Sequence, residues 1–568
     1  MGKSKIKVRE KSHGLNYTDF PLSSYFNCKK YAFLIALSGY SERVLNMKFT
    51  WVQGDKSPIF QDALWVRDEV FTKEQGYPAE IDYDEMDGRA WQLVLYGEEG
   101  HHAAPKAIGT LRFFVNDAGE YQIGRVAILK DYRGQKLGKA LLKEALKKCA
   151  VLAESDTVIL HAQIAAKGLY ETFDFQAEGD IFLEEGEPHI LMKRSLLLGK
   201  VPAELLDRSK KILFIAHLAI GDFTYLQNGF KAFKEAYPHL KMDLFIEEVR
   251  CTNDSQKWPF LKKYSLYDWV ETCDFFHKVY RENYSPALRT ESILEAKLEA
   301  YPIVISIETL ASLNGAGLAR EIAGDKGFAM GMNIHYKWYQ LAQKRDLKKL
   351  DAMIEVVKPD QGKERHISDD YGYWFSQIGG IMMFKEDRYP FVNIPQKWQD
   401  NAKSQLENWG VKKDQPVVFI NHIAKNPRRS WKLEQVRELI ELMQALPKWQ
   451  ETFFIINGIP EIFPEIEALI AKYQLKNTQP FSALDNFFEL PAMLKESDLI
   501  ISVETAVMHL ANAVHVPVIA LMRIKTLEWV PLNSELTTLI FTPKRAEVIA
   551  DIPASRVIEY LPENPYRR

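Results

Sequence analysis

The sequence predicts an α/β protein in which a mixed α/β domain precedes two domains with doubly wound parallel sheets. Three observations lead to this prediction. The chain has 568 residues, which corresponds to about three or four domains at roughly 150 residues each. Strand-like segments and one long amphipathic helix fill residues 47–195. From residue 211 onward, short apolar strands alternate with helical segments, which is typical of parallel sheets.

The composition excludes several classes of protein. The chain is 46% hydrophobic and 26% charged, as in ordinary globular proteins. A net charge of −3 argues against a nucleic-acid partner, because such proteins carry a strongly basic surface. No apolar run approaches the ~18 residues of a membrane-spanning helix, and no apolar core lies near the start as in a secretory signal. We therefore expect a cytoplasmic protein.

The four cysteines lie far apart in the sequence and form no CxxC pair. Their spacing predicts neither a metal site nor a disulfide framework, and it suits a reducing compartment. The cysteines are Cys28, Cys149, Cys251 and Cys273.

We expect five segments along the chain. The first carries little pattern beyond one short apolar helix candidate, Tyr31–Leu45, and its role is unassigned. Gly199 and Pro202, followed by charged residues, indicate a linker between the first domain and the rest. The segments are an extension at 1–46, a mixed α/β domain at 47–195, a linker at 196–210, and Rossmann-like domains at 211–395 and 396–568.

The strands of the first domain surround one strongly periodic helix. Apolar residues from Leu137 to Cys149 recur at helical spacing, with lysines on the opposite face. The expected strands are Trp91–Tyr96, Ala107–Val115, Tyr121–Ile128 and Thr157–Ala162.

The strands of the two later domains are short and apolar throughout, as expected for strands buried on both faces. Residues 310–390 are rich in aromatic side chains and are not assigned to elements. The expected strands are Lys211–Ala216, Met242–Ile246, Ile303–Ile307, Pro416–Asn421, Phe453–Asn457, Leu499–Val503 and Val516–Leu521.

A basic, glycine-containing loop joins the strand Tyr121–Ile128 to the periodic helix. Such a loop points several backbone N–H groups at one spot, at the positive end of a helix dipole. Gly134 and Gly138 let the backbone approach an anion closely, and Arg133 and Lys136 add charge. The loop therefore predicts a pyrophosphate site, and it is not a P-loop because GxxxxGK[ST] is absent.

The spacing Arg-Gly-x-x-x-Gly after an apolar strand resembles the acetyl-coenzyme A signature of the GNAT acetyltransferases. The resemblance implies an N-terminal GNAT domain of mixed α/β fold with acetyl-CoA as its cofactor. The residues that it places at the coenzyme are Val126, Ile128, Arg133, Gly134, Gln135, Lys136, Gly138 and Lys139.

The segment Leu169–Phe175 resembles a second GNAT motif, Leu-Tyr-Glu-x-x-Gly-Phe. The resemblance implies that Tyr170 is the general acid that protonates the leaving thiolate. An alternative is that Tyr170 packs as an ordinary helix aromatic. Asp174 stands where the family usually has glycine.

Segments Val66–Pro78 and Glu187–Met192 resemble the ElaA-type branch of GNAT enzymes, and an acidic run lies between them at residues 80–87. An amine must lose a proton before it attacks a thioester. Glu80 and His189 are therefore candidates for deprotonating a small-molecule amine acceptor. The alternative is that the acidic run is a solvated loop.

Two segments of the later domains resemble glycosyltransferase family 9, the heptosyltransferases. The first is the strand Lys211–Ala216, which runs into Gly221-Asp222. The second, Glu496–Leu521, has a strand that ends in a small polar turn before a helix, a geometry that suits a nucleotide diphosphate. The resemblance implies a GT-B pair of Rossmann-like domains, with the acceptor on the first domain and a nucleotide-diphosphate sugar on the second.

The resemblance also implies site residues. Asp222 matches the catalytic base that deprotonates an acceptor hydroxyl for inverting attack, and no metal is expected because helix N-termini and basic side chains hold the diphosphate. The residues expected at the nucleotide sugar are Arg429, Glu504, Thr505, Ala506 and His509. Arg429 is the one expected to contact phosphate, and the alternative is that it is an ordinary surface arginine.

The part of the chain expected to bind the nucleotide sugar departs from the family pattern at four places. Glu504 stands where the family has aspartate, and Ala506 where it has glycine. Met522-Arg523-Ile524 replaces a glycine-rich loop, and Asn421-His422-Ile423 replaces a Pro-Gly turn. The donor could therefore be ADP-heptose or another nucleotide sugar, and a degenerate transferase stays open.

These expectations combine into a bifunctional transferase that acts on a cell-surface glycan or lipopolysaccharide precursor. Its glycan or glycolipid acceptor could bring it to the inner membrane surface. One alternative keeps only the glycosyltransferase active and makes the GNAT module a binding or regulatory domain. Another makes the C-terminal half a non-catalytic glycan- or nucleotide-binding scaffold. The sequence does not predict the oligomeric state.

Overall fold

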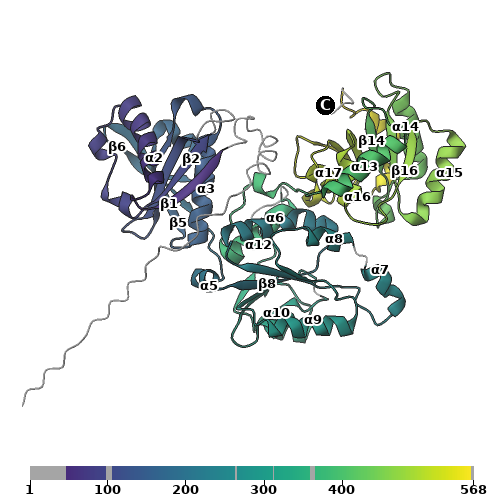
Figure 1. Ribbon diagram of the computed structural model, residues 1–568, viewed down its shortest axis with the longest axis horizontal. Coiled ribbons are helices and arrows are strands. Elements are labelled where there is room, and N and C mark those ends of the chain that lie inside the picture. The colour runs from purple at the N-terminus through teal and green to yellow at the C-terminus, as the bar shows by residue number, and fades with distance from the viewer. Residues whose placement is uncertain (1–46, 98–104, 263–264, 311, 359–364, 564–568) are drawn as a thin grey trace, which may run out of the picture. The chain divides into compact units, whose positions relative to one another are not determined.

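The computed structural model describes residues 47–97, 105–262, 265–310, 312–358 and 365–563. The extension at 1–46, with its expected helix Tyr31–Leu45, lies outside the described residues. The described residues divide into two compact units: those up to residue 112 together with 125–141, and residues 113–124 together with those from 142 onward. The helices and strands of the described residues are labelled in Figure 1.

The strands before residue 196 form a mixed sheet of seven strands in the order β1-β2-β3-β4-β5-β7-β6. β4 and β5 are parallel, whereas β5–β7 and β6–β7 are antiparallel. The strands are β1 (Lys48–Gln53), β2 (Trp91–Gly97), β3 (Lys106–Val115), β4 (Tyr121–Ile128), β5 (Thr157–Gln163), β6 (Gln176–Glu184) and β7 (Glu187–Ser195).

Helix α3 (Leu137–Leu152) confirms the predicted periodic helix. Its apolar face, from Leu141 to Cys149, is buried, while its lysines are at least partly exposed. Helix α2 (Pro58–Arg67) begins at Ser57, whose hydroxyl accepts a hydrogen bond from the Ile59 N–H. The remaining helices of this region are the π-helical η2 (Asp68–Glu74), the 3-10 turns η3 (Ala79–Ile81), η4 (Glu85–Gly88), η5 (Lys130–Tyr132) and η6 (Ile164–Ala166), and α4 (Lys167–Glu171).

A parallel sheet of six strands follows, in the order β10-β9-β8-β11-β12-β13. The strands are β8 (Lys211–Ala216), β9 (Lys241–Ile246), β10 (Lys278–Tyr280), β11 (Ile303–Ser306), β12 (Phe328–Met332) and β13 (Ala352–Ile354). The helices are α6 (Ile220–Ala236), α7 (Trp258–Lys262), α8 (Ser265–Glu271), α9 (Pro286–Leu298), α10 (Gly315–Ala323), α11 (Leu341–Leu347) and α12 (Ile367–Gly379).

A second parallel sheet of six strands has the order β16-β15-β14-β17-β18-β19. The strands are β14 (Val417–Asn421), β15 (Phe453–Asn457), β16 (Thr478–Phe481), β17 (Leu499–Val503), β18 (Val518–Met522) and β19 (Thr537–Phe541). The helices are α13 (Gln396–Asn408), α14 (Leu433–Gln444), α15 (Phe463–Tyr473), α16 (Glu489–Lys495), α17 (Ala506–Ala513) and α18 (Ala554–Ile558), with the 3-10 turn η10 at Pro427–Arg429.

The stretch expected to be a linker, 196–210, contains helix α5 (Ala203–Arg208). Leu206 of this helix is buried in the apolar cluster around β8 and α6. The Lys200 and Val201 N–H groups donate hydrogen bonds of 2.6 and 3.2 Å to the carbonyls of Gln377 and Ile378. The stretch is therefore packed against the end of α12.

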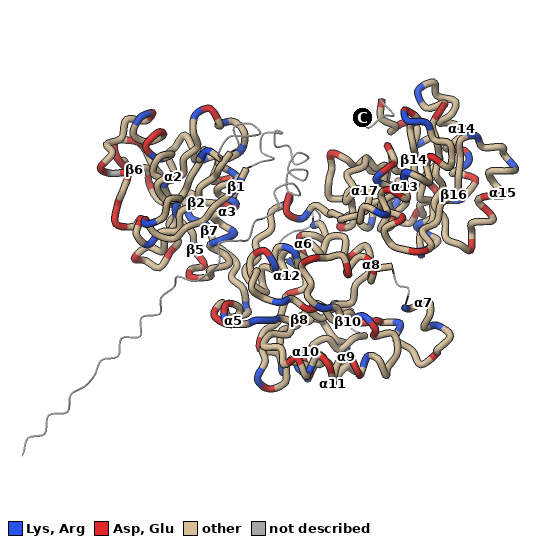
Figure 2. The backbone as a smooth tube through the Cα atoms, viewed as in Figure 1, with Lys and Arg blue, Asp and Glu red and all other residues tan. Residues whose placement is uncertain are grey.

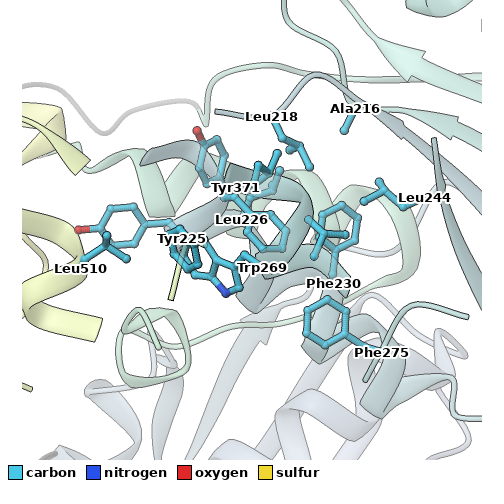
Figure 3. Close-up of a cluster of buried hydrophobic side chains, with 14 of the residues drawn as sticks. Ala216, Leu218, Tyr225, Leu226, Phe230, Leu244, Trp269, Phe275, Tyr371 and Leu510 are labelled. Carbon is cyan, nitrogen blue, oxygen red and sulfur yellow. The ribbon is translucent and has the colours of Figure 1, made fainter. Parts of the chain in front are cut away.

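The largest buried cluster lies around α6 (Figure 3). Phe214 of β8 makes edge contacts with Phe230 and Phe233 of α6, and Phe375 of α12 packs against Phe230. Gly229 permits this packing, because a Cβ there would lie 2.1 Å from the Phe375 ring. Helix α6 is thereby fixed between β8 and α12, the two elements that flank Asp222.

Acidic and basic residues are interspersed along the chain (Figure 2). None of the helices among the described residues combines the length and the apolar character needed to cross a membrane.

Candidate functional sites

The loop between β4 and α3 has the backbone of an anion-binding turn. Gly134 has a φ of +78° and Lys136 a φ of +60°, so the chain turns sharply before the helix begins. Nothing lies within 4 Å of a Cβ built on Gly134, which means that the glycine is needed for its backbone conformation and not for space. The N-terminus of the sixteen-residue helix α3 directly follows this turn.

Arg133 in this loop is held by an ion pair. Its Nε donates to the Ile128 carbonyl at 2.9 Å, and its two Nη atoms lie 2.7 and 2.8 Å from the carboxylate oxygens of Glu74. The hydrogen bonds from Arg133 lower the pKa of Glu74. Both side chains are partly exposed, so the guanidinium can exchange Glu74 for another anion.

The other residues predicted at the coenzyme gather along the same strand and turn. Val126 and Ile128 are half-buried on β4, and Gly138 and Lys139 lie in the first turn of α3. The Gln135 side-chain oxygen is buried and has no hydrogen-bond partner among the described residues. A turn with an unsatisfied buried acceptor beside a helix N-terminus fits a ligand that carries both donors and negative charge.

Tyr170 lies on α4 and is largely buried. Burial raises the pKa of its phenol to about 12, so the group is protonated at neutral pH. Its ring makes an edge contact with Phe175, with centroids 6.2 Å apart. Asp174 closes this turn with a φ of +61°, a conformation that aspartate tolerates better than most residues.

His189 and Glu80 lie on different elements. His189 is on β7, where Nδ1 lies 3.0 Å from the Glu187 carbonyl oxygen and the ring stacks on Phe182. Glu80 is exposed in η3.

The acidic run at residues 80–87 is largely engaged by arginines. Arg67 is fully buried and donates from Nε to Asp82 at 2.9 Å and from Nη1 to Asp87 at 2.9 Å. Arg112 binds Asp84 at 2.7 Å. Burial acts to raise the pKa of Asp87, but the hydrogen bond and charge of Arg67 outweigh it and lower that pKa to about 2. Three acidic residues of the run therefore belong to an ion network, while Glu80 and Glu85 remain exposed.

Asp222 lies in the first turn of α6, directly after the carboxyl end of β8. The Tyr371 hydroxyl donates a hydrogen bond of 2.8 Å to its Oδ1, and Tyr371 lies in the buried cluster shown in Figure 3. Burial raises the pKa of Asp222, while the Tyr371 hydrogen bond and the nearby His217 partly offset this effect. A carboxyl group with a raised pKa accepts a proton more readily than an ordinary aspartate.

The turn between β17 and α17 is filled by a buried ion cluster. Glu504 is 4% exposed and accepts hydrogen bonds of 3.1 Å from both Nε and Nη2 of Arg523. Arg429, in the turn η10, approaches the same carboxylate at 3.4 Å. Arg429 is partly exposed, whereas Arg523 is buried.

Thr505 caps helix α17, at whose first position Ala506 stands. Its hydroxyl accepts a hydrogen bond of 3.3 Å from the Val507 N–H and one of 2.9 Å from the Asn421 side chain. The neighbouring His422, at the end of β14, is buried, and its Nε2 has no hydrogen-bond partner among the described residues. An orphaned buried imidazole at this edge fits a ligand that supplies a donor.

His509 lies apart from this cluster. It is 3% exposed, and its Nδ1 lies 2.8 Å from the hydroxyl of Tyr225 on α6. Burial lowers the pKa of His509 to about 3, so the ring is neutral. The structure therefore brings Arg429, Glu504 and Thr505 together and places His509 against a buried tyrosine.

Two parts of the chain match known families. The GNAT acetyltransferase domain model matches residues 68–196. The N-acetyltransferase YjcF of Bacillus subtilis, itself uncharacterised, is 33% identical over 135 residues, which cover 24% of this chain and 91% of that protein. The protein YyaT of the same bacterium is 29% identical over 158 residues, 27% of this chain and 97% of that protein. The glycosyltransferase family 9 (heptosyltransferase) model matches residues 357–546.

The chain is a fusion of a GNAT acetyltransferase domain and a glycosyltransferase family 9 domain. A crystal structure of a family 9 glycosyltransferase from Veillonella parvula is 16% identical, with a TM-score of 0.47, over 62% of this chain and 96% of that one. Both families are transferases. Among the described residues, no group of three or more His, Cys, Asp or Glu side chains is arranged to hold a metal ion.

Two contacts in the fusion protein were not predicted from the sequence. Tyr371 of the family 9 region binds Asp222 from a position 149 residues away, within the aromatic-rich stretch that had no assigned elements. Arg523 fills the place of the family's glycine-rich loop and pairs with Glu504. Glu504 and Arg523, which both depart from the family pattern, thus form one ion pair. The sequence could have suggested this pair only if the two departures had been considered together.

Proposed function

We propose that the chain is a bifunctional enzyme of the cytoplasm. The GNAT domain is an acetyl-CoA-dependent N-acetyltransferase, and the family 9 region is a metal-independent, inverting glycosyltransferase that uses a nucleotide-diphosphate sugar. The acceptor class is a cell-surface glycan or its lipopolysaccharide-like precursor, and ADP-heptose is the first donor to test. The observation that carries the glycosyltransferase half is the hydrogen bond between Tyr371 and Asp222 at the carboxyl edge of the parallel sheet.

Asp222 acts as the base in this mechanism. Tyr371 holds Oδ1, which leaves Oδ2 to accept the proton of an acceptor hydroxyl. Since burial raises the pKa of this carboxyl, it binds that proton more readily than an exposed aspartate. The nucleotide sugar supplies an anomeric carbon that the deprotonated hydroxyl attacks with inversion.

The donor end of the family 9 domain stabilises negative charge. The start of α17, capped by Thr505, and the partly exposed guanidinium of Arg429 favour an anion at the end of β17. His422 Nε2 is available to accept a hydrogen bond from a hydroxyl. These groups bind and orient the diphosphate without a metal ion.

The GNAT half uses the β4–α3 turn to bind the pyrophosphate of the coenzyme, with Arg133 and the start of α3 as its positive groups. Acetyl-CoA supplies the thioester. The phenol of Tyr170, which burial keeps protonated, donates its proton to the departing thiolate. Glu80 and His189 are the candidates that take the proton of the amine before it attacks.

A screen of nucleotide sugars with the Asp222→Asn variant tests the glycosyltransferase half. We expect transfer, followed as nucleotide release, to fall by about 10²–10⁴-fold, while thiol release from acetyl-CoA in the presence of amines is unchanged. Asp254→Asn, at an exposed 3-10 cap, is the matched control. Full activity in Asp222→Asn would overturn the base assignment.

The GNAT half is tested by thiol release with a panel of amines in the wild type and in Tyr170→Phe. Release that depends on an amine and falls in the variant supports acetyl transfer. No release with any amine, together with retained binding of acetyl-CoA, would instead favour a binding or regulatory module.

A further inference from the structure

Three acidic or basic side chains follow adjacent strands at the carboxyl edge of the first parallel sheet. β8 lies between β9 and β11. The Glu247 N–H, after β9, donates to the Ala216 carbonyl at 2.9 Å, and the Ile307 N–H, after β11, donates to the Ile215 carbonyl at 2.9 Å. Glu247, His217 and Glu308 therefore come at the ends of three neighbouring strands, on the edge where Asp222 begins α6.

Glu308 is the unusual member of this group. It is 3% exposed, and neither of its carboxyl oxygens has a hydrogen-bond partner among the described residues. Leaving a buried polar group unsatisfied costs free energy, so such a group in a folded protein calls for an explanation.

A glycine packs beside this carboxyl group. Gly315, at the start of α10, would place a Cβ 2.2 Å from the Ser306 Oγ and 3.3 Å from the Glu308 Oε2. Any larger residue at position 315 would therefore crowd the space beside Glu308. The glycine is therefore needed for the close approach of α10 to Glu308 and not for a left-handed backbone, since its φ lies outside the positive range.

The nearby cations are already paired. Arg289 donates from Nε to both carboxylate oxygens of Glu247 at 3.0 Å, and Arg250 binds Glu248 at 2.6 Å. Burial first, and then the charge of Glu247, raise the pKa of Glu308, while Arg289 lowers it. The phenol of Tyr336, which is also buried, interacts electrostatically with the same carboxyl.

We propose that Glu308 binds an ammonium group of the glycosyl acceptor, so that the acceptor is an amino sugar or another glycan with a free primary amine. An ammonium has three donors and can satisfy both carboxyl oxygens while it supplies the missing positive charge. This inference rests on the proposed role of Asp222 and names the acceptor class of that site.

The proposal also orders the two reactions. Acetylation of the amine would remove the charge that Glu308 recognises, because an amide nitrogen is neutral. Glycosyl transfer would therefore precede N-acetylation of the same amine.

The test measures binding of three sugars to the full chain by saturation-transfer NMR and calorimetry. We expect D-glucosamine to bind in preference to N-acetyl-D-glucosamine and D-glucose. Glu308→Gln should weaken D-glucosamine about tenfold or more, the loss expected when a buried charge pair is broken. Glu291→Gln, which changes an exposed glutamate on α9, should leave the affinity unchanged.

A second measurement does not depend on the variant. Because burial raises the pKa of the Glu308 carboxyl and a bound ammonium would lower it again, D-glucosamine should release protons on binding, seen as a heat that depends on the ionisation enthalpy of the buffer. Equal binding of the three sugars or no binding of D-glucosamine would each overturn the proposal. Binding of ADP, measured in parallel, separates the outcomes: if ADP also fails to bind, the proposed glycosyltransferase function is at fault.

Discussion

Two strand-to-helix turns of this protein, both proposed to bind an anion, are built in opposite ways. The GNAT turn between β4 and α3 is exposed, has two residues with positive φ, and carries an arginine paired with the surface residue Glu74. The family 9 turn between β17 and α17 is tight and buried, and Glu504 fills it with an ion pair to Arg523. The backbone of the β4–α3 turn is exposed, whereas charged side chains surround the start of α17 in the β17–α17 turn.

The difference shows where the specificity of each site resides. In the GNAT turn, local sequence sets the backbone, so a short motif is sufficient to define the site. In the family 9 turn, Glu504 is held by Arg523 from the end of β18 and approached by Arg429 from η10. The chemistry of this second turn therefore depends on residues from three different segments.

The largest expected difference between the two turns is the loss of stability when the glutamate that pairs with each arginine is replaced by glutamine. In Glu504→Gln the buried guanidinium of Arg523 loses its counter-charge, and we expect a loss of about 3–5 kcal/mol in the stability of that region. Glu74→Gln breaks only the exposed ion pair with Arg133, and we expect no measurable change in the stability of the β4–α3 region. Native-state hydrogen exchange of β17 and β4 measures each effect locally.

The Glu74 variant has a second readout. Without Glu74, Arg133 is available to a phosphate at all times, so acetyl-CoA should bind up to about fivefold more tightly, within the range of surface charge effects. If Glu504→Gln left the exchange of β17 unchanged, the buried ion pair would not be what holds the family 9 turn, and the contrast between the turns would be lost.

The contrast also explains how much of the fold the sequence could predict. Phe453–Asn457 and Leu499–Val503 have the predicted bounds, because each is a short, largely apolar run. Tyr121–Ile128 also has its predicted bounds, although polar residues interrupt its apolar ones. β12 and β13 were not predicted, since they are short and lie in the aromatic-rich stretch. β6 was not predicted either, because most of its residues are exposed and no apolar alternation marks it.

Site prediction followed the same rule. Spacing in the sequence can nominate candidates that would act through their own backbone, such as Gly134, or that belong to a local motif, such as Asp222. The partners Tyr371 and Arg523 cannot, because only the folded chain brings them to Asp222 and Glu504. The acidic run at residues 80–87 could serve a substrate or the fold on sequence grounds. Its buried partner Arg67 decides for the fold at Asp82 and Asp87, and Arg112 does so at Asp84.

A smaller effect should follow from changing the backbone of the open turn. Gly134→Val forces a β-branched residue into a φ of +78°, which costs about 1–2 kcal/mol. We expect about tenfold weaker binding of acetyl-CoA by calorimetry. Gly119→Val is a matched control, because Gly119 has a φ of +77° and equally open surroundings in the turn between β3 and β4. Equal weakening by both variants would mean that strain alone, and not the shape of the coenzyme turn, lowers the affinity.

The smallest effect concerns a third strand-to-helix turn, from β8 to α6, which is intermediate between the other two. Asp222 is half-buried there and accepts a side-chain hydrogen bond from Tyr371. That bond lowers the pKa of Asp222 against the raising effect of burial.

Tyr371→Phe should therefore raise the pKa of Asp222 further. Because the base must be deprotonated to act, glycosyl transfer is lost as the pH falls through the pKa, and the acidic limb of the pH–rate profile should move to higher pH. Transfer at alkaline pH should change little, and the acidic limb of acetyl transfer should stay in place. A uniform loss at all pH values would instead mean that Tyr371 only supports the packing of α12 against α6.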